Sequence, residues 1–264
     1  MAGLATLGGA AVAGEAAGGA EKDYLELRLY RLEPGAMRER FDTFLREAAI
    51  PALNRIGIAS VGVFGLMDEK EAGGPPCQPP NAIGPADLFV LRAHKSIESF
   101  ATANRRLWAD AEFQKAGGAL LDPPKASPTY QRIESSLMLA FDQCPHIEPP
   151  KEKKDTRVFQ LRIYESHSDA KAIKKIEMFN TGGEIALFRR MGLNPVFFGQ
   201  TLAGGKMPNL TYMVTFDDMA AQKAGWAKFI AAPEWNELKA KPEYADTVSN
   251  ITNILLRPTA YSQL

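Results

Sequence analysis

Alternation of apolar and polar residues identifies a strand that the chain carries twice. Residues 24–30 read Tyr-Leu-Glu-Leu-Arg-Leu-Tyr, and residues 159–164 read Phe-Gln-Leu-Arg-Ile-Tyr. A period of two predicts a strand with one apolar face and one polar face. Because the Leu-Arg pair and the closing Tyr recur at the same spacing, the pattern indicates that one module is written twice.

The residues that follow the first strand predict the rest of the module. Apolar residues recur at helical spacing from 37 to 48, so a helix is expected that ends near Pro51 or shortly after. Further strands are expected at 59–66, 88–92 and 135–141. Ser96 is a candidate N-cap for a helix before the last strand. The Pro- and Gly-rich stretch 68–86 is predicted to lack regular structure.

The second copy repeats this order. Residues 191–193 (Met-Gly-Leu) correspond to 56–58 (Ile-Gly-Ile), and the strand at 210–216 corresponds to 88–94. Aligning Asn253-Ile-Leu-Leu with Ser136-Leu-Met-Leu matches the last strands. The order strand, helix, strand, strand, helix, strand is that of the split βαβ, or ferredoxin-like, module.

These observations predict an α+β fold of two tandem ferredoxin-like modules packed sheet to sheet as an intrachain α/β barrel. Residues 21–144 are expected to form the first domain and 156–264 the second, joined by a proline-bearing linker at 145–155. Each sheet carries its helices on one face and must cover the other. This interpretation places Arg28 and Arg162 inside the barrel.

Composition narrows the classes of function. The 31 basic residues balance the 31 acidic ones, which argues against nucleic acid or an anionic membrane surface as a partner. Two cysteines and three histidines without zinc-motif spacing argue against a metal site, and no cofactor is predicted. The histidines, including His94 at a strand end, are expected to be solvated.

Residues 1–20 are nearly all small or apolar and are expected to lie outside the folded domains. The run 4–13 is too short to span a bilayer but suits the apolar part of an export leader, with Ala-Val-Ala at 11–13 as a cleavage site. We therefore expect a bacterial protein exported to the periplasm or the cell exterior, without a transmembrane span. A low-complexity tail on a cytoplasmic protein is the alternative.

The polar face of the repeated strand supplies the candidate ligand-binding residues. An interior guanidinium can hold a carboxylate or carbonyl oxygen while a tyrosine stacks or donates a hydrogen bond. The candidates are Glu26, Arg28, Tyr30 and Ser136 in the first copy, and Gln160, Arg162, Tyr164 and Asn253 in the second. The alternative is a structural network in which Glu26 neutralises Arg28. Gln160 cannot neutralise Arg162, so another group must do so.

Several motifs resemble one known family. Residues 24–30 followed by a Pro-Gly turn resemble the start of a NIPSNAP domain. Asn-Leu-Thr-Tyr-Met-Val at 209–214, Ala-Pro-Glu-Trp at 232–235 and the closing stretch 247–258 resemble bacterial members with two such domains. The resemblance implies the dimeric α/β-barrel superfamily, whose relatives include cofactor-free monooxygenases and haem enzymes. It supplies no catalytic residue.

Two functions stay open at this point. The first is a non-catalytic module that binds a small anionic or carbonyl-bearing molecule, or another protein, with a homo-oligomer as a further expectation. The second is a cofactor-independent oxygenase or isomerase acting on a small organic substrate in the barrel interior. A barrel filled by large side chains favours the first, and an open polar cavity favours the second. The predicted topology also places Cys77 and Cys144 at opposite sheet edges, which disfavours a disulfide.

Overall fold

The computed structural model describes residues 21–77 and 83–264, so the leader expected within residues 1–20 lies outside the described part. The first half contains β1 (Tyr24–Arg31), α1 (Ala36–Phe44), a π-helical segment (Leu45–Ala49), α2 (Ile50–Arg55), β2 (Gly62–Leu66), α3 (Glu69–Ala72), β3 (Leu88–His94), α4 (Ile97–Trp108), α5 (Ala111–Gly117) and β4 (Arg132–Ala140). The second half contains β5 (Val158–Glu165), α6 (Asp169–Phe179), α7 (Glu184–Met191), β6 (Asn194–Ala203), β7 (Asn209–Phe216), α8 (Met219–Ala231), α9 (Pro233–Ala240) and β8 (Asn250–Pro258).

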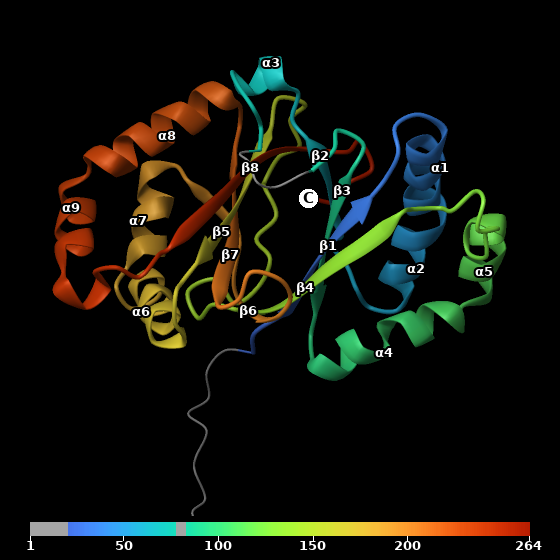
Figure 1. Cartoon of the computed structure of the whole chain (residues 1–264), viewed down its shortest axis with the longest axis horizontal. Coiled ribbons are helices and arrows are strands. Elements are labelled where there is room, and N and C mark those ends of the chain that lie inside the picture. The colour runs from blue at the N-terminus through green and yellow to red at the C-terminus, as the bar shows by residue number, and fades with distance from the viewer. Residues whose placement is uncertain (1–20, 78–82) are drawn as a thin grey trace, which may run out of the picture.

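The strands close into one antiparallel barrel (Figure 1). Their order is β1-β3-β2-β8-β5-β7-β6-β4, so the four strands of each half are neighbours. The halves meet where β2 pairs with β8 and where β4 pairs with β6. Helices α1, α2, α4 and α5 lie on one side of the barrel, and α6 to α9 lie on the opposite side. The expected closure of one barrel within the chain is therefore observed.

The barrel interior is apolar. It is filled by leucine, phenylalanine, methionine and isoleucine side chains from strands of both halves, among them Leu25, Leu27, Phe64, Phe89, Met138, Phe159, Leu161, Phe197, Met213 and Ile254. This overturns the expectation that Arg28 and Arg162 lie inside. Both point outward, beneath the helices, because an interior enclosed by strands alone has no partners for buried charge.

Most strands are therefore largely buried on both faces, although the first residues of β4 and β8 are exposed, and the helices complete two further cores. In the first half Tyr30, Phe41, Leu45 and Leu53 belong to the core under α1, α2 and α4. In the second half, phenylalanines from α6, α7 and α8 meet Tyr212 of β7. The alternation along β1 thus distinguishes the barrel interior from the helix-covered face, rather than core from solvent.

One local expectation needs correction, and two agree with the structure. The first helix runs through a π-helical segment to Arg55, shortly after Pro51. The stretch 68–86 contains the short helix α3, which Asp68 caps by accepting from Lys70 N–H. Ser96 is confirmed as the N-cap of α4, since its Oγ accepts from Ser99 N–H at 3.1 Å.

Between β4 and β5 the chain forms an irregular connection that contacts β6 of the second half, where Glu148 N–H donates to Val196 O.

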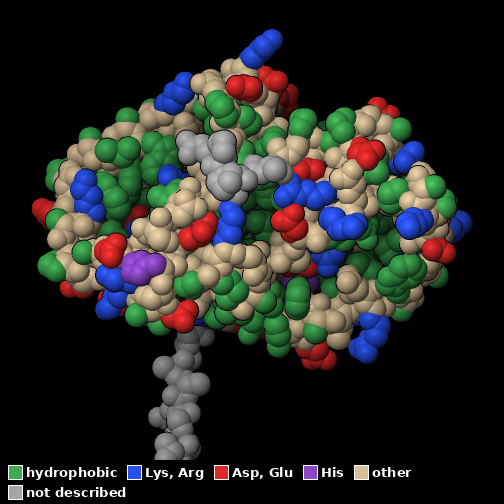
Figure 2. Space-filling view, in the orientation of Figure 1, with side chains coloured by type: hydrophobic (Ala, Val, Ile, Leu, Met, Phe, Trp, Pro, Cys, Tyr) green, Lys and Arg blue, Asp and Glu red, His purple; other side chains and the backbone are tan. Residues whose placement is uncertain are grey.

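Cys77 and Cys144 do not form a disulfide. Among the described residues, no helix is long and apolar enough to cross a bilayer. Basic and acidic side chains are interspersed on the face shown in Figure 2.

Candidate ligand-binding site

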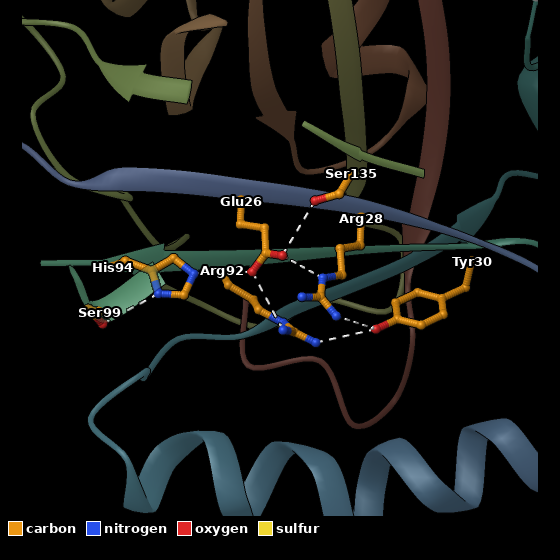
Figure 3. Close-up of polar contacts among 7 residues, drawn as sticks. All are labelled: Glu26, Arg28, Tyr30, Arg92, His94, Ser99 and Ser135. Atoms are coloured by element: carbon orange, nitrogen blue, oxygen red, sulfur yellow. Dashed lines mark hydrogen bonds and ion pairs between the residues drawn. The ribbon is translucent and has the colours of Figure 1, made fainter. Parts of the chain in front are cut away.

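A cluster of charged side chains lies on the outer face of β1 and β3 (Figure 3). The antiparallel register sets Glu26 opposite Arg92, and alternate residues of both strands share the face. Arg28 Nε donates to Glu26 Oε1 at 2.5 Å, and Arg92 Nη1 lies 3.5 Å from Glu26 Oε2. His94 Nε2 lies 3.1 Å from the same oxygen. Glu26 is thus the anion around which three nitrogen-bearing groups gather.

Tyr30 ties the two guanidinium groups together. Its hydroxyl accepts from Arg28 Nη1 at 3.4 Å and from Arg92 Nη2 at 3.3 Å. Arg92 is only 3% exposed, yet its Nε and Nη1 atoms make no hydrogen bond. Buried donors are normally satisfied, so Arg92 has hydrogen-bonding capacity to spare.

Electrostatics keep the cluster charged. Burial alone would raise the pKa of Glu26, but the hydrogen bond with His94 and the charges of Arg92 and Arg28 outweigh it and lower the pKa to about 2. Burial likewise opposes the charge of Arg28, but Tyr30 and Glu26 raise its pKa. Burial lowers the pKa of Arg92, although a guanidinium remains protonated at neutral pH. Two cations therefore face one carboxylate.

A cavity of about 390 Å³ opens next to this cluster, between the sheet and the helices of the first half. Arg28, Arg92 and Tyr30 lie at its polar end. Its walls are mainly apolar and include Phe41, Phe44, Leu45, Phe113, Trp108 and Tyr130. Trp108 is 54% exposed and Tyr130 39%, which places them on the solvent side. The cavity thus combines a cationic end with an apolar body.

The second half has the corresponding strand but a different environment. Gln160 Oε1 accepts from Trp226 Nε1 at 2.7 Å, and its Nε2 donates to Asn253 Oδ1 at 2.6 Å. The Arg162 guanidinium lies over the rings of Trp226 and Tyr164, with its carbon 4.7 and 5.2 Å from their centroids. Cation–π contacts of this kind stabilise a desolvated guanidinium.

Aromatic residues fill the space that is open in the first half. Tyr212 pairs with Arg162 in the register of β7 and β5, whereas Val90 pairs with Arg28. Tyr212 stacks on Phe198 and donates to the Tyr164 hydroxyl at 3.0 Å. A large ring thus stands where the first half has a valine.

A carboxylate from α7 acts on Arg162 through its charge. Burial lowers the pKa of Arg162, but Tyr212, Tyr164 and the charge of Glu184 raise it. Glu184 has its own partner, because Lys175 Nζ donates to it at 2.7 Å and both side chains are buried. Glu184 thus acts on Arg162 within the same half of the molecule, but it is shared with Lys175, and Arg162 Nε makes no hydrogen bond.

Six of the eight predicted candidates lie together as two groups of three. Glu26, Arg28 and Tyr30 form one, and Gln160, Arg162 and Tyr164 the other. Asn253 joins the second group through Gln160. Ser136 was placed wrongly, because it faces the barrel interior while Ser135 Oγ lies 3.4 Å from Glu26 Oε1. In the register, Ser135 pairs with Arg28 as Asn253 pairs with Arg162.

Sequence reasoning missed Arg92 and His94. His94 is buried, contrary to the expectation that it is solvated, and it bridges Glu26 and Ser99, whose Oγ lies 3.4 Å from Nδ1. A period of two along 88–94 was available as a signal, since it sets residues 90, 92 and 94 on one face.

The order Ser99, His94, Glu26 has the connectivity of a nucleophile, a base and an orienting acid. The amide hydrogens beside Ser99 are already engaged, because Ser99 N–H donates to Ser96 Oγ and Phe100 N–H to Ser96 O. They do not form an oxyanion hole, which acyl transfer needs. Both nitrogens of His94 are also hydrogen-bonded, so this residue does not fit the role of a haem ligand.

Comparison with known proteins finds a family match in the second half. A family model described as NIPSNAP matches residues 159–263. The second half thus resembles a NIPSNAP domain. A search of curated proteins found no match. A structure of an uncharacterized NIPSNAP-like domain protein from Burkholderia xenovorans is 20% identical, covers 41% of this chain and 90% of its own, and has a TM-score of 0.37.

Two longer structures are similar across both halves of the chain. A candidate monooxygenase from Fusobacterium nucleatum is 6% identical, with 90% of this chain and 93% of that chain covered and a TM-score of 0.52. A candidate monooxygenase from Lactobacillus acidophilus is 11% identical, with 90% and 94% covered and the same TM-score. At these identities the likeness shows the fold alone.

Proposed function

We propose that the protein is a non-catalytic binding module that holds a small anionic molecule with an apolar body in the cavity of its first half. The observation that carries this proposal is the pair Arg28 and Arg92 at the polar end of the cavity, two cations that face the single carboxylate of Glu26. An anionic group at this end of the cavity would balance the remaining positive charge.

The cavity suits such a ligand in size and polarity. Its volume of about 390 Å³ lies in the range of about 300 to 1,000 Å³ that is typical of small-molecule sites. Aromatic and aliphatic walls would bury the apolar body, which stabilises binding, while the charged end would fix its orientation. Because Tyr212 and its neighbours fill the corresponding space, we expect one site per chain.

Native mass spectrometry of protein purified from its own host tests the proposal directly. The expected result is an added mass that is lost from Arg92→Met but kept in Arg162→Met, a matched change of a half-buried arginine in the other half. Calorimetric titration with naphthalene-2-sulfonate, a small apolar anion, should show binding that Arg92→Met weakens by at least about tenfold. Equal binding by wild type and Arg92→Met would contradict the proposal.

The alternative function, a cofactor-independent oxygenase or isomerase in the barrel interior, has weaker support. The interior between the two halves is filled by large apolar side chains. A second cavity of about 420 Å³ lies at one end of the barrel, lined by Leu27, Phe89, Leu161, Ser136 and Lys206 among others. Oxygen consumption or product formation from a bound ligand would favour this alternative.

The finer organisation and the location are part of the same proposal. We interpret the halves as two ferredoxin-like modules with domains at 21–144 and 156–264, because each contributes four adjacent strands in the same spatial order. We also propose export to the periplasm or the cell exterior, on the basis of the apolar run at 4–13. Recovery of intact Met1 from the cytoplasmic fraction of native cells would contradict export.

A further inference from the structure

We propose that the cavity of the first half selects ligands with a single negative charge and rejects dianions of the same shape. This inference rests on the proposed function and goes beyond it by fixing the charge of the ligand. It follows from the fixed charges at the polar end of the cavity, where Glu26 neutralises one of the two arginines.

The count leaves one positive charge unmatched. Among the described residues that line the cavity, Arg28 and Arg92 are the charged ones. Glu26 does not line the cavity, but its two carboxylate oxygens contact Arg28, Arg92 and His94. The remaining polar lining, Tyr30, Asn104 and Thr129, is uncharged. One carboxylate against two guanidinium groups leaves a charge of +1 for the ligand to balance.

The arrangement of the donors identifies which arginine binds the ligand. Arg28 donates hydrogen bonds from Nε to Glu26 and from Nη1 to Tyr30. Arg92 donates from Nη2 to Tyr30, its Nη1 lies 3.5 Å from Glu26 Oε2, and neither Nη1 nor Nε makes a hydrogen bond. A monoanion that accepts from Arg92 neutralises the site. A dianion would bring a second buried charge for which the lining has no cation, and that charge is costly to desolvate.

The second half offers a natural comparison for the role of Glu26. Gln160 occupies the equivalent position and carries no charge. Replacing Glu26 with Gln should therefore leave the cavity with a charge of +2 at nearly constant shape. On this argument Glu26→Gln is a gain-of-function variant, because it should accept the dianions that the wild type rejects.

Two ligands of the same shape separate charge from size. Naphthalene-2-sulfonate keeps one negative charge across the working pH range, whereas 2-naphthylphosphonate gains a second charge near neutrality, as phosphate groups do at about pH 6. Each is titrated calorimetrically at about pH 5 and about pH 9. At low pH both anions carry one charge, so any titration of the protein, including that of His94 behind Glu26, acts on both alike. The neutral 2-naphthalenesulfonamide serves as the uncharged control.

For the wild type, the two anions are expected to bind alike at low pH, and the phosphonate at least about tenfold more weakly than the sulfonate at high pH. Glu26→Gln should abolish or reverse this difference. An affinity ratio that stays constant with pH in the wild type would overturn charge selection while leaving the proposed function intact. Sulfonate binding no tighter than sulfonamide binding would overturn the proposed function itself. Circular dichroism and thermal unfolding confirm that Glu26→Gln is folded before its affinities are compared.

Discussion

At the residue scale, one substitution between the two halves changes the chemistry of an otherwise similar strand. In the first half Glu26 gathers Arg28, Arg92 and His94, so the cluster is held by charge. In the second half Gln160 replaces the carboxylate, and Arg162 depends on aromatic rings and on Glu184. The sequence comparison of these positions predicted that Arg162 needs another partner, but it could not locate that partner, which lies on a helix.

Glu26 should make stability depend on pH in the acid range. Its folded pKa of about 2 lies below the ordinary value of 4.5, so its contribution is present above pH 4.5 and is lost as the pH falls toward 2. The difference in unfolding free energy between wild type and Glu26→Gln should therefore shrink by about 3 kcal/mol over this interval. Urea unfolding at several pH values measures it, and a difference that does not change with pH would contradict the assignment.

The buried Lys175 and Glu184 should matter more for stability than Arg162 does. Lys175→Met leaves a buried carboxylate without its direct partner and is expected to destabilise the fold by about 3 to 5 kcal/mol. Arg162→Met leaves that ion pair intact, so a change within about 1 kcal/mol is expected. Chemical denaturation of both variants checks the order, and Lys175→Met combined with Glu184→Leu should recover part of the loss. A larger effect of Arg162→Met would show that Arg162 is the main partner of Glu184.

At the element scale, periodicity predicted the strands well but not the side to which each face turns. The alternation along 24–30 is exact, yet both faces of β1 are buried, so the polar face could be assigned to the barrel interior or to the helices. Closure of the barrel decides which face is which. Strands alone surround the interior, so no helix or loop can supply a partner for a charged side chain there. The misplacement of Ser136 has a related cause, since a shift of one residue in aligning β4 with β8 turns a side chain to the opposite face.

A single substitution in β3 should close the cavity of the first half. Val90→Tyr puts on β3 the ring that Tyr212 puts on β7, at the position paired with Arg28. It should fill the space beside the cluster and abolish binding of naphthalene-2-sulfonate, at a cost of about 1 to 3 kcal/mol from overpacking. Calorimetry and thermal unfolding measure the two effects. Val90→Ile is the control, and retained affinity in a folded Val90→Tyr variant would place the ligand elsewhere.

At the scale of the whole molecule, each half covers the apolar sheet face of the other. Leu25, Phe64 and Met138 from the first half and Phe159 and Met213 from the second share one interior. The seams are short, since β2 pairs with β8 only over residues 64–66. Burial of the shared apolar faces, rather than hydrogen bonds at the seams, should therefore dominate the association of the halves.

A separated half should consequently dimerise. Residues 156–264 expressed alone would expose the apolar face that carries Phe159, Leu161, Phe197 and Met213, and a second copy offers the same kind of surface. We expect a homodimer or a larger assembly by analytical ultracentrifugation. In the intact chain the first half already covers this face, and halves separated by proteolysis within 149–154 should still co-elute as one species. A soluble, folded monomer of 156–264 would show that the interior contributes little to holding the halves together.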